Sequence, residues 1–448
     1  MFAVNSNIAV VMGRQSAYIF SPTGAPDDSG MIPCTLTLPG NRPPASTAKP
    51  ETIFCVAVDI TRRNPVQHIV ICDNVKTVYI FHFKDSAWSL RQSWVMPQRI
   101  EKIMFDPDEN YIVMLGKTGD VYAAMFGTEA ISRFRTIMGH VSYVMDMTIT
   151  NDSSSPHIIT CDRDEKIRVA KFPLAYEIRY YALAHKTAVV NLGLVNNDDY
   201  LISASTDGTL ILWGVDPRNM EFELGHPHHL NDVLLRKVEA WDVFEMLGIA
   251  NETVAETPTS KSKPSIEESK PSHELLKMKS TYLPDGRVFV CIMITGLSEL
   301  VVFEIIPPDT TKMLSEEIED AKIRLVTKET MDHSSVDITW VGTTLYLLYP
   351  HIGTMKKLVL SQEGELSRDD GFNPAFEIEM KLDISLFGST RISSMPLHKR
   401  VWSKPDRIND DENVEDAIAA SNLSPLAKTV KKSGDWVIQL GADDVDEN

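Results

Sequence analysis

The sequence predicts an all-β fold, a seven-bladed β-propeller, because a turn-plus-strand unit repeats along the chain. Four apolar strands start 43, 46 and 43 residues apart. They occupy residues 78–81, 121–124, 167–170 and 210–213. This spacing is typical of a propeller blade, which needs about 40–45 residues to form four strands.

A His residue recurs in phase with these strands, at intervals of 45 and 41 residues. In such blades a His before the first strand often bonds toward the Asp of a later turn. We therefore expect His140 to pair with Asp164, and His185 to pair with Asp207. The two His residues, Asp207 and the strand-ending Trp213 are interpreted as structural blade markers, and Asp is a good turn former because it accepts from backbone donors.

Three weaker strands extend the array to seven units. They lie at residues 17–20, 300–303 and 357–360. Seven blades are a common closure number, and closing the ring removes the exposed sheet edges that invite aggregation.

The predicted propeller covers residues 1–402 and contains three insertions. Residues 21–50 are rich in Pro and Ser, which predicts an extended loop. Residues 227–248 are expected to be helical, and residues 249–274 lack large apolar side chains and are expected to be disordered. The helical pattern rests on four apolar residues at helical spacing, namely Leu230, Leu234, Val238 and Trp241.

Residues 403–448 form an acidic tail that we expect to be mostly disordered. The tail holds 5 Lys and Arg against 11 Asp and Glu, and the whole chain has a formal net charge of −18. A protein that grips nucleic acid by itself usually has a basic surface. One apolar island in the tail, residues 436–440, could add a strand, bind a partner or do neither.

The cysteines and the terminus favour a soluble protein in a reducing, intracellular setting. The five cysteines are odd in number and never spaced as Cys-x-x-Cys, which argues against disulfides and structural zinc. We find no signal peptide and no apolar run long enough for a membrane span. The cysteines are Cys34, Cys55, Cys72, Cys161 and Cys291.

Sequence signatures of catalysis are mostly absent. No phosphate-binding loop, dinucleotide-binding turn, nucleophile elbow or His-Glu-x-x-His helix is present. The cluster of His226, His228 and His229 is not predicted to bind metal, because His226 fits the blade repeat and the other two open the predicted helix. The sequence thus predicts no catalytic residue, metal site or cofactor, and favours a binding protein.

Residues 162–169 form a charged string that exceeds what a blade needs. Side chains alternate along a strand, so Lys166 and Arg168 are expected to share a face. The next blade has Thr209 and Ile211 in these places. Replacing a buried Ile with Arg is costly unless the guanidinium is paired or reaches the surface.

Two explanations for Arg168 stay open at this point. Its guanidinium could form a salt bridge with Asp162 or Glu165 inside the blade. It could also form a cationic spot at the rim that binds a carboxylate of a partner, since the Arg fork suits bidentate contact with carboxylates.

The charged string, together with residues 139–142 and 117–122, resembles the WD-repeat, non-catalytic subunit of the eukaryotic tRNA (guanine-N7-)-methyltransferase. The clearest similarity covers about residues 110–215. The sequence departs from the repeat pattern at Ala170 and Lys171, which replace the usual Trp-Asp blade ending, and at Gly214, which replaces Asp. These departures weaken the repeat signature and leave the charged string intact.

The resemblance implies a scaffold subunit in a heterodimer. Its partner would bind S-adenosylmethionine, make most of the tRNA contacts and methylate N7 of a guanine in the variable loop. The resemblance also implies a nuclear location, with the cytoplasm as the alternative. The family's interface maps onto Arg163, Asp164, Lys166 and Arg168, with Lys117 as a weaker candidate.

Arg168 comes first in this mapping, so its replacement by Glu is expected to release the partner from a folded propeller. The alternative function is a general WD-repeat adaptor, such as a substrate receptor of a ubiquitin ligase. A propeller hydrolase would require carboxylates or His residues that converge at the mouth of the channel.

Overall fold

The computed structural model describes most of the first 369 residues and a short hairpin near the C-terminus. The described residues are 2–5, 7–12, 16–22, 34–39, 55–62, 67–127, 130–151, 155–195, 198–215, 235–249, 273–308, 321–331, 337–349, 354–369, 427–432 and 435–440. The chain consists of two units, Met1–Pro396 and Leu397–Asn448.

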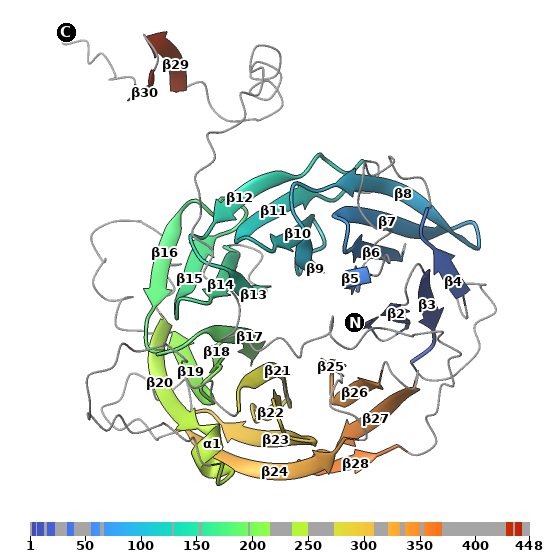
Figure 1. Cartoon of the computed structure of the whole chain (residues 1–448), viewed down its shortest axis with the longest axis vertical. Helices are drawn as coiled ribbons and strands as arrows, with labels where there is room; N and C mark the ends of the chain where they lie inside the picture. The colour runs from blue at the N-terminus through green and yellow to red at the C-terminus, as the bar shows by residue number, and fades with distance from the viewer. Residues whose placement is uncertain are drawn as a thin grey trace, which may run out of the picture. The chain divides into compact units, whose positions relative to one another are not determined.

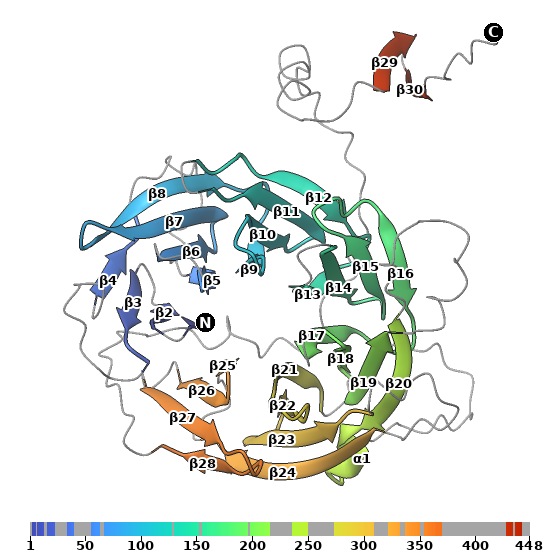
Figure 2. The same cartoon turned by 180° about the vertical axis from the view of Figure 1, so that it is seen from behind.

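The first unit is a ring of seven four-stranded antiparallel sheets, as the sequence predicted (Figure 1). Every sheet consists of four consecutive strands, and the first strand of each lies nearest the centre of the ring (Figure 2). Blades one to three consist of β1 (Phe2–Val4), β2 (Ala9–Met12), β3 (Ser16–Phe20), β4 (Cys34–Thr37), β5 (Cys55–Ile60), β6 (His68–Asp73), β7 (Thr77–Lys84), β8 (Ala87–Val95), β9 (Ile100–Phe105), β10 (Tyr111–Gly116), β11 (Asp120–Met125) and β12 (Arg135–Gly139).

The other four blades follow the same order. They consist of β13 (Val144–Ile149), β14 (His157–Asp162), β15 (Ile167–Lys171), β16 (Ile178–Ala182), β17 (Val189–Val195), β18 (Tyr200–Ser205), β19 (Thr209–Val215), β20 (Leu235–Asp242), β21 (Leu275–Tyr282), β22 (Val288–Ile294), β23 (Glu299–Ile306), β24 (Lys322–Thr330), β25 (Asp337–Val341), β26 (Thr344–Tyr349), β27 (Thr354–Leu360) and β28 (Leu366–Arg368). A short helix, α1 (Val243–Met246), follows β20.

All seven apolar strands that carried the sequence repeat are third strands of blades. They lie in β3, β7, β11, β15, β19, β23 and β27. The third strand is paired with a strand on each side, and its two faces pack against the two neighbouring blades, so its residues are apolar in succession.

The core lies between blades, because apolar side chains of neighbouring sheets form a separate cluster at each of the seven junctions. At the junction where the ring closes, Phe2 and Val11 of blade one pack against Tyr346, Leu348 and Met355 of blade seven. No strand is exchanged between these two blades in the part of the chain that the structure describes. Side-chain packing therefore joins the first and last blades.

The structure differs from the predictions made for two of the insertions. Residues 34–37, inside the predicted loop 21–50, form β4, the outer strand of blade one. The helix predicted for residues 227–248 is wrong over Leu235–Asp242, which form β20 and pair with β19. Asp242 caps α1 by accepting from the backbone N–H groups of Phe244 and Glu245, so the helix begins only at Val243.

Several sequence predictions fall outside the described residues. They concern most of the insertion at 249–274, the His residues at 226, 228 and 229, and most of the tail at 403–448. In the second unit, β29 (Ala427–Lys432) and β30 (Asp435–Leu440) form an antiparallel hairpin. The apolar island at residues 436–440 thus forms a strand.

Candidate partner-binding surface

The turns between second and third strands lie beside the linkers between blades, and together they form one face of the ring, called here the turn face. Backbone hydrogen bonds connect these segments in sequence from blade to blade. The N–H of His140 donates to Gly119 O at 3.0 Å, and the N–H of Arg163 donates to Tyr143 O at 2.9 Å. The turn of blade three, the linker 140–143 and the turn of blade four are therefore joined side by side.

Asp162 holds the turn of blade four, which carries the charged string. Its Oδ1 accepts from the backbone N–H groups of Asp164 at 3.0 Å and Lys166 at 3.1 Å. Its Oδ2 contacts His140 Nδ1 at 3.2 Å, and His140 Nε2 contacts Thr160 Oγ1 at 2.9 Å. Both Asp162 and His140 are buried, so the turn is attached to the core of the ring.

The predicted pairing of His140 with Asp164 is therefore wrong, since Asp162 takes that place and Asp164 is exposed. Blade two uses the same device, where Asp73 Oδ1 accepts from Val75 N at 2.9 Å and Thr77 N at 2.8 Å. In both blades the Asp directly follows a Cys near the end of the second strand. This repeated Cys-Asp pair is the sequence signal that could have identified the turn former.

Glu165 adopts the left-handed backbone region, with φ of 71°. The corresponding residue of blade five is Gly208, with φ of 86°. This conformation costs a residue other than glycine about 1 kcal/mol. The two hydrogen bonds that Asp162 accepts hold the strained turn. In this turn Asp164, Glu165 and Lys166 are exposed to solvent.

Arg168 lies on β15 and is only 7% exposed. Its Nη1 donates to Gly139 O of blade three at 3.2 Å, and its Nη2 donates to Ala175 O at 3.0 Å. Its Nε is buried and has no partner within the described residues. Burial lowers the pKa of the Arg168 guanidinium, and Tyr181 partly offsets this effect. Arg168 thus connects blades three and four from inside.

This position changes the interpretation of the charged string. Lys166 lies in the turn before β15 and is exposed, whereas Arg168 is buried, so the two do not share a face. The alternation rule fails here because it applies only within a strand, and β15 begins at Ile167. Backbone carbonyls accept from both Nη atoms of Arg168, in place of the salt bridge with Asp162 or Glu165 that was one of the two explanations.

Four of the five predicted interface residues do lie on the turn face. Lys117 is exposed on the turn of blade three, and Asp164 and Lys166 are exposed on the turn of blade four. Arg163 is half-buried between that turn and the linker, where its N–H binds Tyr143 O. Because the two turns flank one linker, these residues belong to one surface.

Two apolar residues of the turn face escaped the sequence analysis. Val141 is 80% exposed in the linker before blade four, and Leu183 is 66% exposed in the linker after it. Both lie within two residues of a blade-marker His in a segment without strand pattern, which is the signal that could have found them. Exposed apolar residues beside opposite charges are typical of protein–protein interfaces.

His185 of blade five is buried, and its hydrogen-bond partner differs from the predicted one. Its Nε2 contacts Ser203 Oγ at 2.6 Å, and Trp213 Nε1 donates to the same oxygen at 2.8 Å. Asp207 forms the turn by accepting from Thr209 N at 3.0 Å. Asp207 therefore acts on His185 through its charge, and the expected direct bond is replaced by the Ser203 contact.

Burial lowers the pKa of His185 to about 4, against the opposing charge of Asp207. Between pH 6.5 and 4 the unfolded chain therefore binds a proton here that the folded chain does not. Acidification through this window should remove about 3 kcal/mol of stability. We expect His185→Gln to reduce the pH dependence of urea unfolding between pH 7 and pH 4.5. If the wild type and His185→Gln lose the same stability over this pH range, the assignment is contradicted, because all other acid-sensitive groups are the same in the two proteins.

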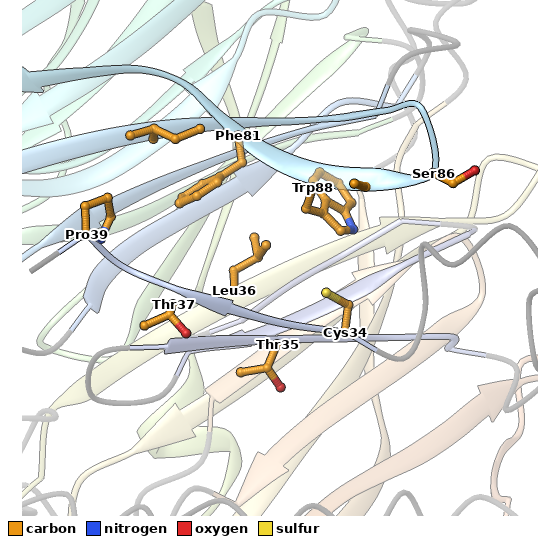
Figure 3. A pocket seen from close by; sticks show the side chains of 10 residues that line it. Cys34, Thr35, Leu36, Thr37, Pro39, Phe81, Ser86 and Trp88 are labelled. Atoms are coloured by element: carbon orange, nitrogen blue, oxygen red, sulfur yellow. The ribbon is translucent and has the colours of Figure 1, made fainter.

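A separate pocket of about 530 Å³ lies between β4 and the β7–β8 hairpin. Figure 3 shows Leu36, Phe81 and Trp88 around it, with the thiol of Cys34 at one side. Its lining has no charged side chain, and burial raises the pKa of the Cys34 thiol. The pocket is thus unlike the charged turn face and contains none of the predicted site residues.

Within the described residues, no group of three His, Cys, Asp or Glu side chains could hold a metal ion. Over the same residues, none of the helices has the length and apolarity that crossing a membrane requires. The four cysteines with described side chains are free thiols, namely Cys34, Cys72, Cys161 and Cys291.

Residues 127–323 match the family model described as the tRNA methyltransferase TRM82 WD40 domain. The resemblance inferred from the charged string is confirmed. The stretch that matches this WD40 domain includes the turn of blade four and the linkers on both sides, while Lys117 precedes it.

Two relatives illustrate the similarity. The "tRNA (guanine-N(7)-)-methyltransferase non-catalytic subunit wdr4" of Xenopus laevis is 34% identical over 164 residues, covering 36% of this chain and 39% of the relative. The subunit named wuho of Drosophila mojavensis is 42% identical over 112 residues, covering 25% of this chain and 28% of the relative. The similarity thus spans well under half of each relative.

Solved structures show the same fold at low identity. The β-propeller domain of Myceliophteria thermophila Cps50 (Swd1) is 9% identical with a TM-score of 0.50, covering 80% of this chain and 94% of that chain. A chain of a mitotic checkpoint complex is 9% identical with a TM-score of 0.54, covering 81% and 90%. These similarities concern the propeller architecture.

Proposed function

We propose that the chain is the non-catalytic scaffold subunit of a tRNA (guanine-N7-)-methyltransferase. It binds and stabilises a catalytic subunit, which holds S-adenosylmethionine, contacts most of the tRNA and forms 7-methylguanosine in the variable loop. The observation that carries the proposal is the family match over residues 127–323, which contains the exposed charged turn of blade four. The names of the relatives support the same role for this chain.

The turn face supplies the chemistry that such an interface needs. Lys117, Asp164 and Lys166 offer charges of both signs, and Val141 and Leu183 offer apolar surface on the two linkers that flank blade four. A partner with complementary charges is favoured over proteins that place like charges there. The chain's net charge of −18 fits a subunit that leaves most phosphate contacts to its partner. We propose a nuclear location on the resemblance alone.

Charge reversal on the turn face tests this proposal. We expect the double variant Lys117→Glu, Lys166→Glu to fold like the wild type and to bind the catalytic subunit at least tenfold more weakly, about 1.4 kcal/mol. Both side chains are exposed, so the change alters the surface without burying a charge. The measurement is the Kd for the purified catalytic subunit, together with co-purification after co-expression.

Lys237→Glu is the matched control, because Lys237 is exposed on β20, an outer strand of the ring. The control should bind the catalytic subunit with wild-type affinity. Wild-type yield and salt resistance of the complex with the double variant would show that the interface lies elsewhere. A wild-type chain that co-purifies with ubiquitin-ligase components instead would favour the adaptor function.

A further inference from the structure

Exposed apolar side chains concentrate along the outer strand of blade four, β16, at the outside of the ring (Figure 1). Five of them lie within residues 174–183, whereas no ten-residue stretch elsewhere in the described part of the chain holds more than two. Single exposed apolar residues are common, but a contiguous group of them marks an interaction surface. The group, called here the blade-four patch, consists of Leu174, Tyr176, Ile178, Tyr181 and Leu183.

A bulge in β16 places two residues of the blade-four patch on one face of the sheet. Ile178 pairs with Ala170 of β15. Tyr181 pairs with Arg168, because the register shifts and leaves Arg179 as the extra residue. Side chains that lie directly opposite each other in paired strands share a face. Ala170 packs in the apolar cluster with blade three, and Arg168 donates to a carbonyl of that blade. Ile178 and Tyr181 therefore both lie on the side of β16 that faces blade three.

The turn before β16 is held from inside the ring. Ala175 is buried, and its carbonyl oxygen accepts from Arg168 Nη2 at 3.0 Å. The N–H of Glu177 donates to Leu174 O at 3.0 Å and closes the turn. Leu174 and Tyr176 are thus exposed on either side of a buried residue. A surface that is already ordered loses little conformational freedom when a partner binds to it.

The strand β16 lacks the charges that usually protect the edge of a sheet. It pairs only with β15 among the strands that the structure describes. Natural edge strands commonly carry Lys and other charged residues that prevent unwanted association. The outer strand of blade six follows this rule, since Lys322, Arg324 and Lys328 are exposed on β24. The charged residue of β16, Arg179, pairs instead with Glu177 at 3.4 Å.

The blade-four patch is continuous with the turn face. Leu183 belongs to both, because it directly follows β16 and begins the linker after blade four. On the other side, Arg168, the strand partner of Tyr181, donates to Gly139 O at 3.2 Å. Val141, the other exposed apolar residue of the turn face, follows Gly139 by two residues. An apolar centre with a charged border is the usual composition of a protein–protein interface.

We infer that the blade-four patch is the apolar centre of the interface with the catalytic subunit, and that the charges of the turn face form its polar border. This inference rests on the proposed function. The surface of the catalytic subunit that covers the patch is expected to be apolar, with hydrogen-bond acceptors for the hydroxyl groups of Tyr176 and Tyr181. Buried Tyr residues are among those that contribute most to binding in such interfaces.

The test is the Kd of the full chain for the purified catalytic subunit. We expect the double variant Ile178→Thr, Tyr181→Thr to bind at least about tenfold more weakly than the wild type. Thr suits a strand, so the variant should keep the wild-type far-UV circular dichroism. The matched control is Leu90→Thr, Leu325→Thr, on the outer strands of blades two and six. The control residues are 40% and 42% exposed, against 44% and 40% for Ile178 and Tyr181, and the control should bind like the wild type.

Salt dependence separates the apolar centre from the charged border. The double variant of the blade-four patch should keep the wild-type dependence of the Kd on salt concentration, because it removes no charge. Lys117→Glu, Lys166→Glu should change that dependence, since salt screens exposed charges.

A single variant keeps the inference testable if the double variant does not fold. Tyr176 lies in the turn before β16 and takes no part in strand pairing, so Tyr176→Ser should fold and should bind the catalytic subunit severalfold more weakly. If the wild-type complex forms and neither variant changes its Kd, the blade-four patch is not part of the interface, although the proposed function stands.

Two further outcomes would overturn the inference. If the wild type does not bind the catalytic subunit at all, the proposed function fails and the inference fails with it. If the wild type self-associates in sedimentation experiments, and the variants abolish this without changing the Kd for the catalytic subunit, the patch binds a second copy of the chain.

Discussion

Arg168→Glu should lower the free energy of unfolding by about 3–5 kcal/mol, the typical cost of an uncompensated buried charge. The new carboxylate would lie where Arg168 is 7% exposed, and it would face the carbonyl oxygens of Gly139 and Ala175. Both Nη donors would be lost, and the oxygens of the new carboxylate would face carbonyl oxygens, which are acceptors too. Urea unfolding followed by far-UV circular dichroism measures the change. This expectation replaces the sequence-based one, in which the same variant stays folded.

Two other variants separate burial from binding. Arg168→Met keeps much of the apolar volume without a charge, so it should lose less stability than Arg168→Glu. Arg168→Lys keeps one donor group, so its free energy of unfolding should lie between those of Arg168→Met and the wild type. If Arg168→Glu unfolds at the wild-type urea concentration and fails only to bind the catalytic subunit, then the side chain belongs to the interface and the buried position is wrong.

Asp162→Ala should cost about 2–4 kcal/mol and should also weaken partner binding. The variant leaves the backbone N–H groups of Asp164 and Lys166 without their acceptor and removes the contact of His140. An unsatisfied buried polar group costs about 1–3 kcal/mol. The turn around Glu165 would lose the bonds that hold its left-handed conformation. Thermal or urea unfolding measures the first effect, and the Kd for the catalytic subunit measures the second.

Asp162→Asn is the matched control, because its amide oxygen can keep both turn bonds. Its loss of stability should be smaller, with its affinity for the catalytic subunit close to that of the wild type. If Asp162→Ala binds the catalytic subunit as tightly as the control, the geometry of this turn does not matter for binding.

The fold was predictable because the third strands repeat as buried apolar segments after short turns. β4 and β20 were missed for opposite reasons. β4 is a four-residue strand inside a Pro-rich stretch, where local composition predicts a loop. β20 has apolar residues at helical spacing, and only its pairing with β19 makes it a strand. Outer strands are half-covered, so their sequence pattern is weak.

The sequence predicted where the candidate site lies better than it predicted the role of each residue. The charged string identified the turn of blade four, which the structure places on the turn face. The role of Arg168 depends on the carbonyl of Gly139, 29 residues away on another blade, and local pattern cannot show such a contact. The exposure of Val141 and Leu183 depends on where the linkers lie between blades.

We propose that this chain is the non-catalytic subunit of a tRNA methyltransferase. The most direct measurement is 7-methylguanosine in tRNA after incubation with the candidate catalytic subunit, with and without the co-expressed full chain. We predict that the two proteins co-purify, that methylation is high only when both are present, and that the chain alone forms none. A catalytic subunit that methylates tRNA equally well alone and does not retain this chain would contradict the account.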